Sequence, residues 1–297
     1  MRKVFVFIFL FCFYKLYTQE NLLSLIDEPL QENLVFATFK TKKIINLQSI
    51  EQTDKNELDF IISHRFGPIN SGYTDLYGID IGLVRMILDY GITDYISLIL
   101  ARGSTEKVID ISSKIKLLSQ GKNKSPITIS SYSSVFFDTI EGNVWGVLDE
   151  KTKNKGVGFF QQILIASKLN TNLSVQLTPI FSNMYLVDKT TFFGERKNIW
   201  AIGIGGRYKL NKSVTLNSEW ISPIIDGKEI IHPIKNQYFI NSFAIGFDIE
   251  TGGHVFQLFF TNSERMSEKG YVFQNNNKWN EGGVFFGFNI SRTFNLQ

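Results

Sequence analysis

Residues 246–263 read GFDIETGGHVFQLFFTNS, and this stretch decides the fold. The run that leads into Thr251-Gly252-Gly253 alternates bulky apolar with small or polar side chains: Phe243, Ile245, Phe247 and Ile249 against Ser242, Ala244, Gly246, Asp248 and Glu250. The run that follows repeats the pattern, with Phe256, Leu258 and Phe260 against Gln257, Thr261 and Ser263. A period of two is that of a β-strand. The stretch therefore predicts a hairpin with one apolar and one polar face.

A hairpin with these faces fits two kinds of protein. In a soluble sandwich the apolar face packs on a second sheet, whereas in a membrane barrel it meets lipid and the polar face lines the lumen. Segments of about ten residues, the length that a tilted strand needs to cross a bilayer, recur along the chain. We predict strands at 57–66, 80–90, 94–103, 107–118, 126–138, 157–169, 173–183, 198–210, 213–223, 238–250, 254–263 and 283–294. The faces of the sixth segment, within GVGFFQQILIASKLN, are ambiguous.

Short and long connections alternate between these segments. The links after the even-numbered strands are tight, such as Asn211-Lys212, whereas most of the others are about 11 to 18 residues long. The link at Gly103-Ser104-Thr105 is a short exception. This asymmetry is typical of outer-membrane barrels. We predict an all-β protein, an antiparallel transmembrane β-barrel of about 12 strands with short periplasmic turns and longer extracellular loops.

The first 18 residues predict a signal peptide. Arg2 and Lys3 precede an apolar run of 11 residues, 4–14, which is shorter than the roughly 20 residues that a membrane-spanning helix needs. Cleavage after Thr18 would remove Cys12, the only cysteine, so the mature chain would need no disulfide. Lipid attachment at Cys12 is disfavoured by the bulky residue before it. We expect export through this signal to the cell outer membrane.

Charge gives no support for a nucleic-acid partner. Of 31 basic residues, Arg2, Lys3 and Lys15 would leave with the signal, so 28 basic residues balance 28 acidic ones. The expected partners are outer-membrane lipid and the barrel-assembly machinery, with a small solute or a periplasmic protein as further candidates.

The mature chain divides into residues 19–56 and a barrel of residues 57–297. The stretch 35–46 is too basic and too irregular for a lipid-facing strand. Two positions remain open for 19–56, a periplasmic leader, which we slightly favour, or a segment folded into the lumen.

Charged residues on the predicted inner face are candidates for lining the lumen: Asp59, Arg65, Arg85, Asp89, Asp110, Lys114, Lys116, Asp138, Arg207, Lys209, Glu219, Asp248 and Glu250. They either pair into a polar filling or line a narrow aqueous path, because 12 strands lie between the filled barrels of about 8 strands and the open channels of about 16. Their mixed signs argue against strong ion selectivity. Aromatic residues on the outer face predict contacts at the lipid interface: Tyr90, Trp200, Tyr208, Trp220 and Phe294.

The sequence offers little for catalysis. Three histidines, His64, His232 and His254, are spread over the chain. A lipid hydrolase would need a serine and an acidic or amide partner around one of them, and Ser63 points to the face opposite His64. The spacings typical of metal sites are missing. We expect no catalytic residue, no metal, no cofactor and no enzyme activity.

Several segments resemble an uncharacterised family of outer-membrane β-barrel proteins, a domain of unknown function. They are TFKTKKIINLQSIE (38–51), ELDFIISHRFGPINSGYTDLYGID (57–80), LDYGITD (88–94), GIGGRYKL (203–210), IGFDIETGGHVFQLFFTNS (245–263) and VFFGFNISRTF (284–294). The resemblance covers almost the whole mature chain and implies the barrel fold, but no activity or site.

The leading functional hypothesis is a passive pore or a barrel that binds or transports a small solute. Two alternatives remain, an outer-membrane barrel enzyme acting on lipid and a secreted soluble β-sandwich binding protein.

Overall fold

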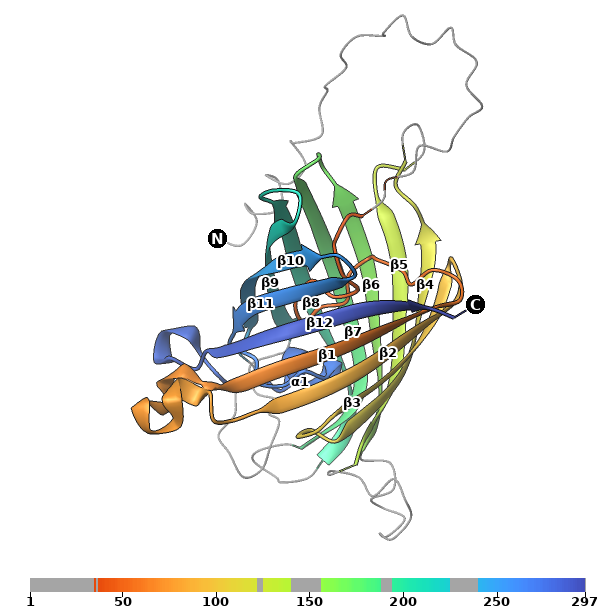
Figure 1. Cartoon of the computed structure of the whole chain (residues 1–297). Helices are drawn as coiled ribbons and strands as arrows, with labels where there is room; N and C mark the ends of the chain where they lie inside the picture. The colour runs from red at the N-terminus through yellow and green to blue at the C-terminus, as the bar shows by residue number, and fades with distance from the viewer. Residues whose placement is uncertain are drawn as a thin grey trace, which may run out of the picture. The chain divides into compact units, whose positions relative to one another are not determined.

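Twelve strands form a closed barrel in the computed structural model, which describes residues 35, 37–121, 125–139, 156–187, 194–224 and 240–296 (Figure 1). Each strand pairs antiparallel with its sequence neighbours, and β12 closes on β1. The strands are β1 (Glu57–Pro68), β2 (Leu83–Thr93), β3 (Ile96–Gly103), β4 (Val108–Leu118), β5 (Thr128–Asp138), β6 (Val157–Lys168), β7 (Leu173–Val187), β8 (Gly194–Lys209), β9 (Val214–Ile224), β10 (Ser242–Thr251), β11 (His254–Thr261) and β12 (Phe285–Asn295).

All twelve predicted strands are confirmed, with three main differences in extent. The tenth begins at Ser242 rather than at residue 238. The hairpin of β7 and β8 continues beyond the predicted ends, because residues 184–187 still pair with 194–197. The second strand begins at Leu83 rather than at residue 80, since the preceding loop forms two short 3₁₀ helices, η2 (Ile69–Ser71) and η3 (Tyr73–Gly78). The predicted signal peptide and His232 lie outside the described residues.

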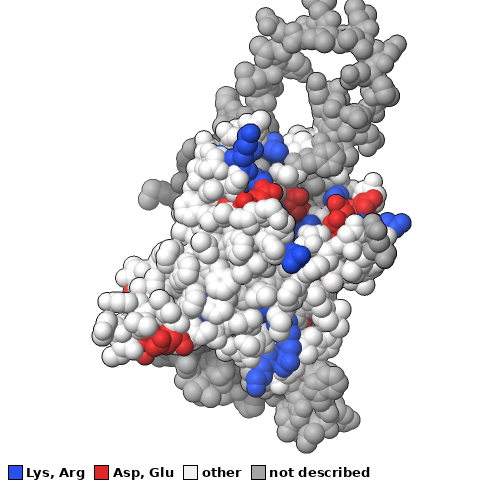
Figure 2. Space-filling view, viewed as in Figure 1, with Lys and Arg blue, Asp and Glu red and all other residues white. Residues whose placement is uncertain are grey.

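The faces of the barrel are those of a membrane protein. Phe247 is 45% exposed on the outer wall, whereas the neighbouring Asp248 is 3% exposed on the inner one. The part of the wall seen in Figure 2 carries few charged side chains through its middle, and most of them gather toward its ends. A closed sheet with its apolar face outward contradicts the soluble sandwich, which needs that face packed on a second sheet.

Two further segments enter the barrel. Residues 37–56 precede β1 and therefore enter from the end that carries the short turns, which is periplasmic in outer-membrane barrels. Residues 262–284 link β11 to β12 at the opposite end and contain α1 (Glu268–Phe273), all of whose residues are buried. A short 3₁₀ helix, η4 (Trp279–Glu281), follows α1. Within the described ranges, no helix is long and apolar enough to cross a membrane.

The position of residues 37–56 corrects one preference drawn from the sequence. Phe39, Ile44 and Leu47 are at most 2% exposed and belong to the barrel's hydrophobic core. Of the two positions left open, the lumen is therefore the one that this stretch occupies, and the preference for a periplasmic leader was wrong for it.

Candidate functional site: the filled lumen

The structure places ten of the thirteen predicted lumen residues in the interior, each at most 6% exposed: Asp59, Arg65, Arg85, Asp89, Asp110, Lys114, Asp138, Arg207, Glu219 and Asp248. Lys116 and Lys209 are half-buried and Glu250 is exposed, near the turn end.

The five predicted interface aromatics are 37–54% exposed on the outer wall. Their contact with lipid stays a prediction.

The N-terminal segment forms a tight hairpin inside the barrel, which we call the inner hairpin (residues 41–49). Lys43 and Gln48 form an antiparallel bridge, and the Ile44 amide donates to the Leu47 carbonyl at 2.8 Å. The tip, residues 44–47, thus points into the lumen. Its turn directs three successive amides toward the wall.

Glu219 on β9 holds this tip. The backbone N–H groups of Ile45, Asn46 and Leu47 donate to its carboxylate at 3.1, 2.8 and 3.0 Å. Hydrogen bonds to a charged acceptor are stronger than those between neutral groups. A single wall carboxylate therefore fixes the tip in place.

Other wall residues also bind the main chain of the segment rather than its side chains. Lys114 donates to the carbonyls of Ser49 and Glu51 at 3.2 and 3.1 Å. Further donors contact carbonyls of the segment: Arg207 those of Ala37 and Thr38, Gln257 those of Lys43 and Ile44, Gln176 that of Gln48, and Asn289 that of Ile45. The polar residues of the lumen thus form a sleeve around a peptide backbone.

Glycines on β8 make room for the hairpin's apolar side chains. A Cβ at Gly205 would lie 2.3 Å from Cδ1 of Ile44, and one at Gly203 would lie 2.9 Å from Cδ1 of Leu47. The next residue, Gly206, faces outward, where its nearest such contact is 3.7 Å away. The glycines of this strand therefore have a packing role.

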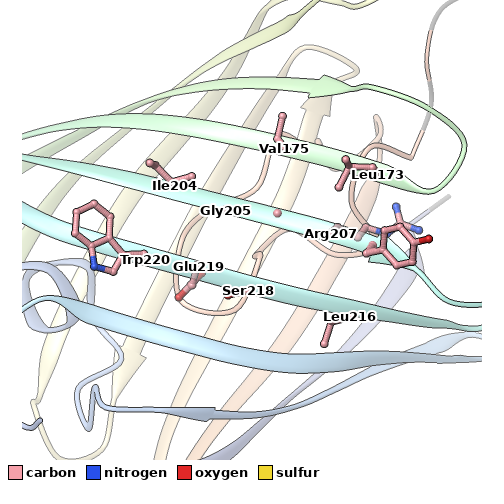
Figure 3. A pocket seen from close by; sticks show the side chains of 11 residues that line it. Leu173, Val175, Ile204, Gly205, Arg207, Leu216, Ser218, Glu219 and Trp220 are labelled. Atoms are coloured by element: carbon pink, nitrogen blue, oxygen red, sulfur yellow. The ribbon is translucent and has the colours of Figure 1, made fainter. Parts of the chain in front are cut away.

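Gly206 forms part of a shallow groove of about 360 Å³ in the wall of β7, β8 and β9. Figure 3 shows Val175, Ile204 and Trp220 beside it. The groove is mainly apolar, as a surface in contact with lipid is expected to be.

The loop that carries α1 is fixed by buried charges. The Glu106 carboxylate accepts from the amides of Met266 and Ser267 at 3.0 and 2.9 Å, and from the Ser267 hydroxyl at 2.6 Å. Lys269 pairs with Asp138 at 2.7 Å. Gly270 leaves no space for a larger residue, because a Cβ there would lie 2.3 Å from Oε1 of Glu106.

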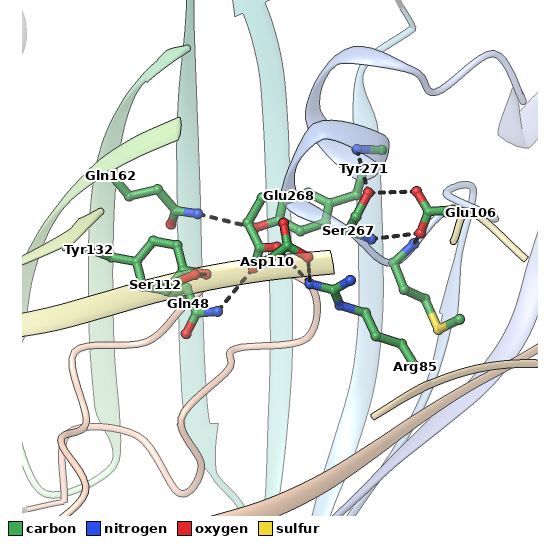
Figure 4. Close-up of polar contacts among 12 residues, drawn as sticks. Gln48, Arg85, Glu106, Asp110, Ser112, Tyr132, Gln162, Ser267, Glu268 and Tyr271 are labelled. Carbon is green, nitrogen blue, oxygen red and sulfur yellow. Dashed lines mark hydrogen bonds and ion pairs between the residues drawn. The ribbon is translucent and has the colours of Figure 1, made fainter. Parts of the chain in front are cut away.

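Arg85 joins α1 to the barrel wall (Figure 4). Its guanidinium forms ion pairs with Asp110 and, at 3.1 Å, with Glu268. Burial alone would raise the pKa of Glu268, but Arg85 and Lys43 together hold that pKa below its ordinary value. Glu268 therefore stays ionised inside the lumen.

The inner hairpin and α1 meet inside the barrel. The Gln48 amide donates to the Glu268 carboxylate at 3.1 Å, and the Lys43 ammonium lies 5.8 Å from the centre of the Tyr271 ring. Burial lowers the pKa of Lys43 to about 8, with Glu268 opposing the shift. The two segments thus enter the lumen from opposite ends and share a polar contact.

Sequence reasoning missed four buried charges, Lys43, Glu106, Glu268 and Lys269. None of them lies in a strand, so the alternation of faces could not reveal them. One local signal exists: Ser267 accepts a hydrogen bond from the Gly270 amide, and a serine before an acidic residue is typical of a helix start.

The geometry gives no support to a catalytic His64. Its ring stacks on Phe288 at 4.9 Å and contacts Phe66 at 4.5 Å, while Ser63 is buried on the opposite face. Among the described residues, no group of three or more His, Cys, Asp or Glu side chains could hold a metal ion.

A family model of the "Membrane bound beta barrel domain (DUF5777)" matches residues 39–294. The chain belongs to this family. The resemblance drawn from the sequence segments is therefore confirmed, and the family's function is unknown. No curated protein sequence matches the chain.

Solved outer-membrane proteins share the fold at low sequence identity. An outer membrane channel from Pseudomonas putida F1 is 12% identical, with a TM-score of 0.50 over 82% of this chain and 98% of that one. The NanC porin is 11% identical, with a TM-score of 0.49 over 80% of this chain and 98% of that one. The likeness to the Pseudomonas putida channel shows the fold alone. This fold is that of outer-membrane barrels, which indicates a place in the outer membrane.

Proposed function

We propose that this protein is an outer-membrane pore for small solutes whose lumen is closed by its own inner hairpin. The proposal includes export through residues 1–18, a lipid environment reached through the barrel-assembly machinery, and no enzyme activity, metal or cofactor. The observation that carries it is the sleeve of polar wall residues around the hairpin's main chain, with Glu219 at the tip.

A polar wall favours a closed pore over a barrel that is permanently filled. Arg65, Lys114, Arg207 and Glu219 are charged groups that water can solvate as well as the hairpin does. Leaving a buried charge without a partner is costly in a dry core but not in a wetted one. Displacement of the hairpin would therefore leave an inner wall that water can fill.

Mixed signs on this wall favour small neutral or zwitterionic solutes over ions of one charge. The thirteen inner residues predicted from the sequence comprise seven acidic and six basic side chains. A pore of this kind discriminates weakly between cations and anions. In a salt gradient across a planar bilayer, we expect a reversal potential close to zero.

A glycine pair on β8 provides the test. Gly205→Val would crowd the inner hairpin against the wall, because its Cβ would lie 2.3 Å from Cδ1 of Ile44 and its two methyl groups would need the space that the Ile44 side chain fills. Gly206→Val makes the same substitution one residue along on the outer face and is the matched control. We expect brief and rare openings from the wild type and from the control, and sustained conductance from Gly205→Val.

Proteolysis shows whether the hairpin has moved. Lys42 and Lys43 become accessible to trypsin from the turn end only when the hairpin leaves the lumen. If trypsin cleaves Gly205→Val there while its conductance equals that of the wild type, the pore proposal is wrong.

A further inference from the structure

A cluster of polar side chains interrupts the outer wall at β4, β5 and β6. Ser113 pairs with Ser133 in register, and Ser133 pairs with Gln161, so the three residues form one row across three strands. Ser131 lies two residues from Ser133 on the same face. All four are half-buried and alternate with buried, inward-facing neighbours.

The outward residues around this polar cluster are apolar: Ile109, Ile111, Ile115, Val135, Phe159, Ile163 and Phe181. The cluster lies near the middle of these strands, at the depth of the hydrocarbon. Acyl chains offer no hydrogen bonds, so polar groups facing them cost free energy unless they find partners. Outward Ser218 on β9 has such a partner, since its hydroxyl donates to the Ala244 carbonyl.

Hydrogen bonds within the polar cluster use only some of its donors and acceptors. The Ser133 hydroxyl donates to the Gln161 side-chain oxygen at 2.6 Å, and the Gln161 amide donates to the Ser131 oxygen at 2.9 Å. With the described residues, neither the Ser113 nor the Ser131 hydroxyl donates a hydrogen bond. Each hydroxyl oxygen also has two lone pairs. Donors and acceptors therefore both remain available at the surface.

A second copy of this chain matches that chemistry. The cluster is neutral and offers donors and acceptors of the same kind, so an identical cluster facing it is complementary. An acyl chain offers no hydrogen bonds, and a charged partner would place a charge at the depth of the hydrocarbon, which costs free energy. Two copies inserted in the same direction pair about a two-fold axis along the membrane normal. We propose that Ser113, Ser131, Ser133 and Gln161 are the centre of such a dimer contact.

The two-fold axis fixes which residues meet. Adjacent strands are about 4.8 Å apart, so the row from Ser113 to Gln161 is roughly 10 Å wide. Rotation about an axis along the membrane normal through its centre leaves every residue at its own depth, so Ser133 faces Ser133 of the second copy. The row crosses strands that tilt by roughly 35–45° in such barrels, so Ser113 and Gln161 lie at different depths and do not face each other across the axis.

Cysteine cross-linking in membranes tests this arrangement in the full chain. With Cys12→Ser as background, Ser133→Cys is expected to form a disulfide-linked dimer on oxidation. Ser113→Cys and Gln161→Cys, alone or mixed, are expected to form less of it, because both positions lie away from the axis. Phe247→Cys, exposed in mid-wall on β10, is the matched control without cross-links. Heat-modifiable mobility on gels verifies that each barrel is folded.

A second measurement separates dimer formation from random collision. Ser131→Ala, Ser133→Ala and Gln161→Leu combined should lower the dimer association constant in detergent about ten-fold, as expected for losing one or two interchain hydrogen bonds. Cross-linking of Ser133→Cys no stronger than that of Phe247→Cys, or an unchanged association constant in the folded triple variant, would overturn the proposal and show a lipid-facing cluster. Neither readout depends on whether the lumen opens.

Discussion

Replacing Glu219 by glutamine tests the hold on the inner hairpin with almost no change of shape. The carboxylate accepts three hydrogen bonds from the amides of Ile45, Asn46 and Leu47. A hydrogen bond to a charged group contributes about 1.5–3 kcal/mol. The glutamine oxygen can keep one or two of the three bonds, and the neutral amide avoids the desolvation cost of a buried charge. We therefore expect a net loss of about 2 kcal/mol.

A loss of this size raises the ratio of undocked to docked hairpin roughly 30-fold. Two assays report that ratio independently. The fraction of time that single channels spend open in a planar bilayer should rise by about this factor while it remains small. Hydrogen exchange of the amides of residues 45–47 should accelerate by a similar factor, because these amides exchange when the tip leaves the carboxylate.

Glu264→Gln is the matched control, since it removes one exposed carboxylate from the loop before α1. Both readouts should stay at the wild-type level in this variant. If Glu219→Gln also leaves the exchange of residues 45–47 unchanged, Glu219 does not hold the tip. If exchange accelerates but the open time does not, the hairpin is held as described but does not close a pore.

Three further variants test other contacts inside the barrel. A disulfide between Ile44→Cys and Gly205→Cys, whose side chains meet at the wall, should keep the bilayer conductance at its closed level until a reductant is added. Lys43→Met should raise the midpoint of heat unfolding at pH 7, and the difference should vanish toward pH 10. The reason is that burial lowers the pKa of Lys43 to about 8, so the cost of its buried charge is full below pH 8 and fades as pH rises toward 10.5. Gly270→Ala should destabilise the loop by about 1–3 kcal/mol through its clash with Glu106, seen as faster proteolysis from the loop end.

The strands could be predicted from the sequence because their two faces meet different media. Phe247 and Asp248 alternate since one touches the outside and the other the interior, and this difference repeats every second residue. The closed barrel could be predicted from the alternation of short and long links between the strands. The two-residue alternation of side chains also placed the inner charges on the correct face of each strand.

What fills the lumen could not be predicted in the same way. The inner hairpin is held mainly through its main chain, so its own side chains need no regular pattern, and the basic, irregular stretch 35–46 suggested a leader. Glu268 and Lys269 sit in a helix of six residues, too short to show periodicity. The sequence around an inward-facing charge such as Glu219 also looks the same whether its side chain faces water or a peptide.

The ambiguous faces of β6 have a physical explanation that unites the inner and outer observations. Phe160 points inward because α1 presents an apolar partner, the Phe273 ring at 6.2 Å. Gln161 points outward because it bonds to Ser131 and Ser133 of β5. Apolar and polar residues alternate along a barrel strand where lipid lies outside it and a polar lumen lies inside. On β6 the alternation fails at positions such as Phe160 and Gln161, where protein groups replace those media. A break in the alternation of a barrel strand therefore marks a contact with another segment or another chain, and on β6 the inner half of that inference is already visible in α1.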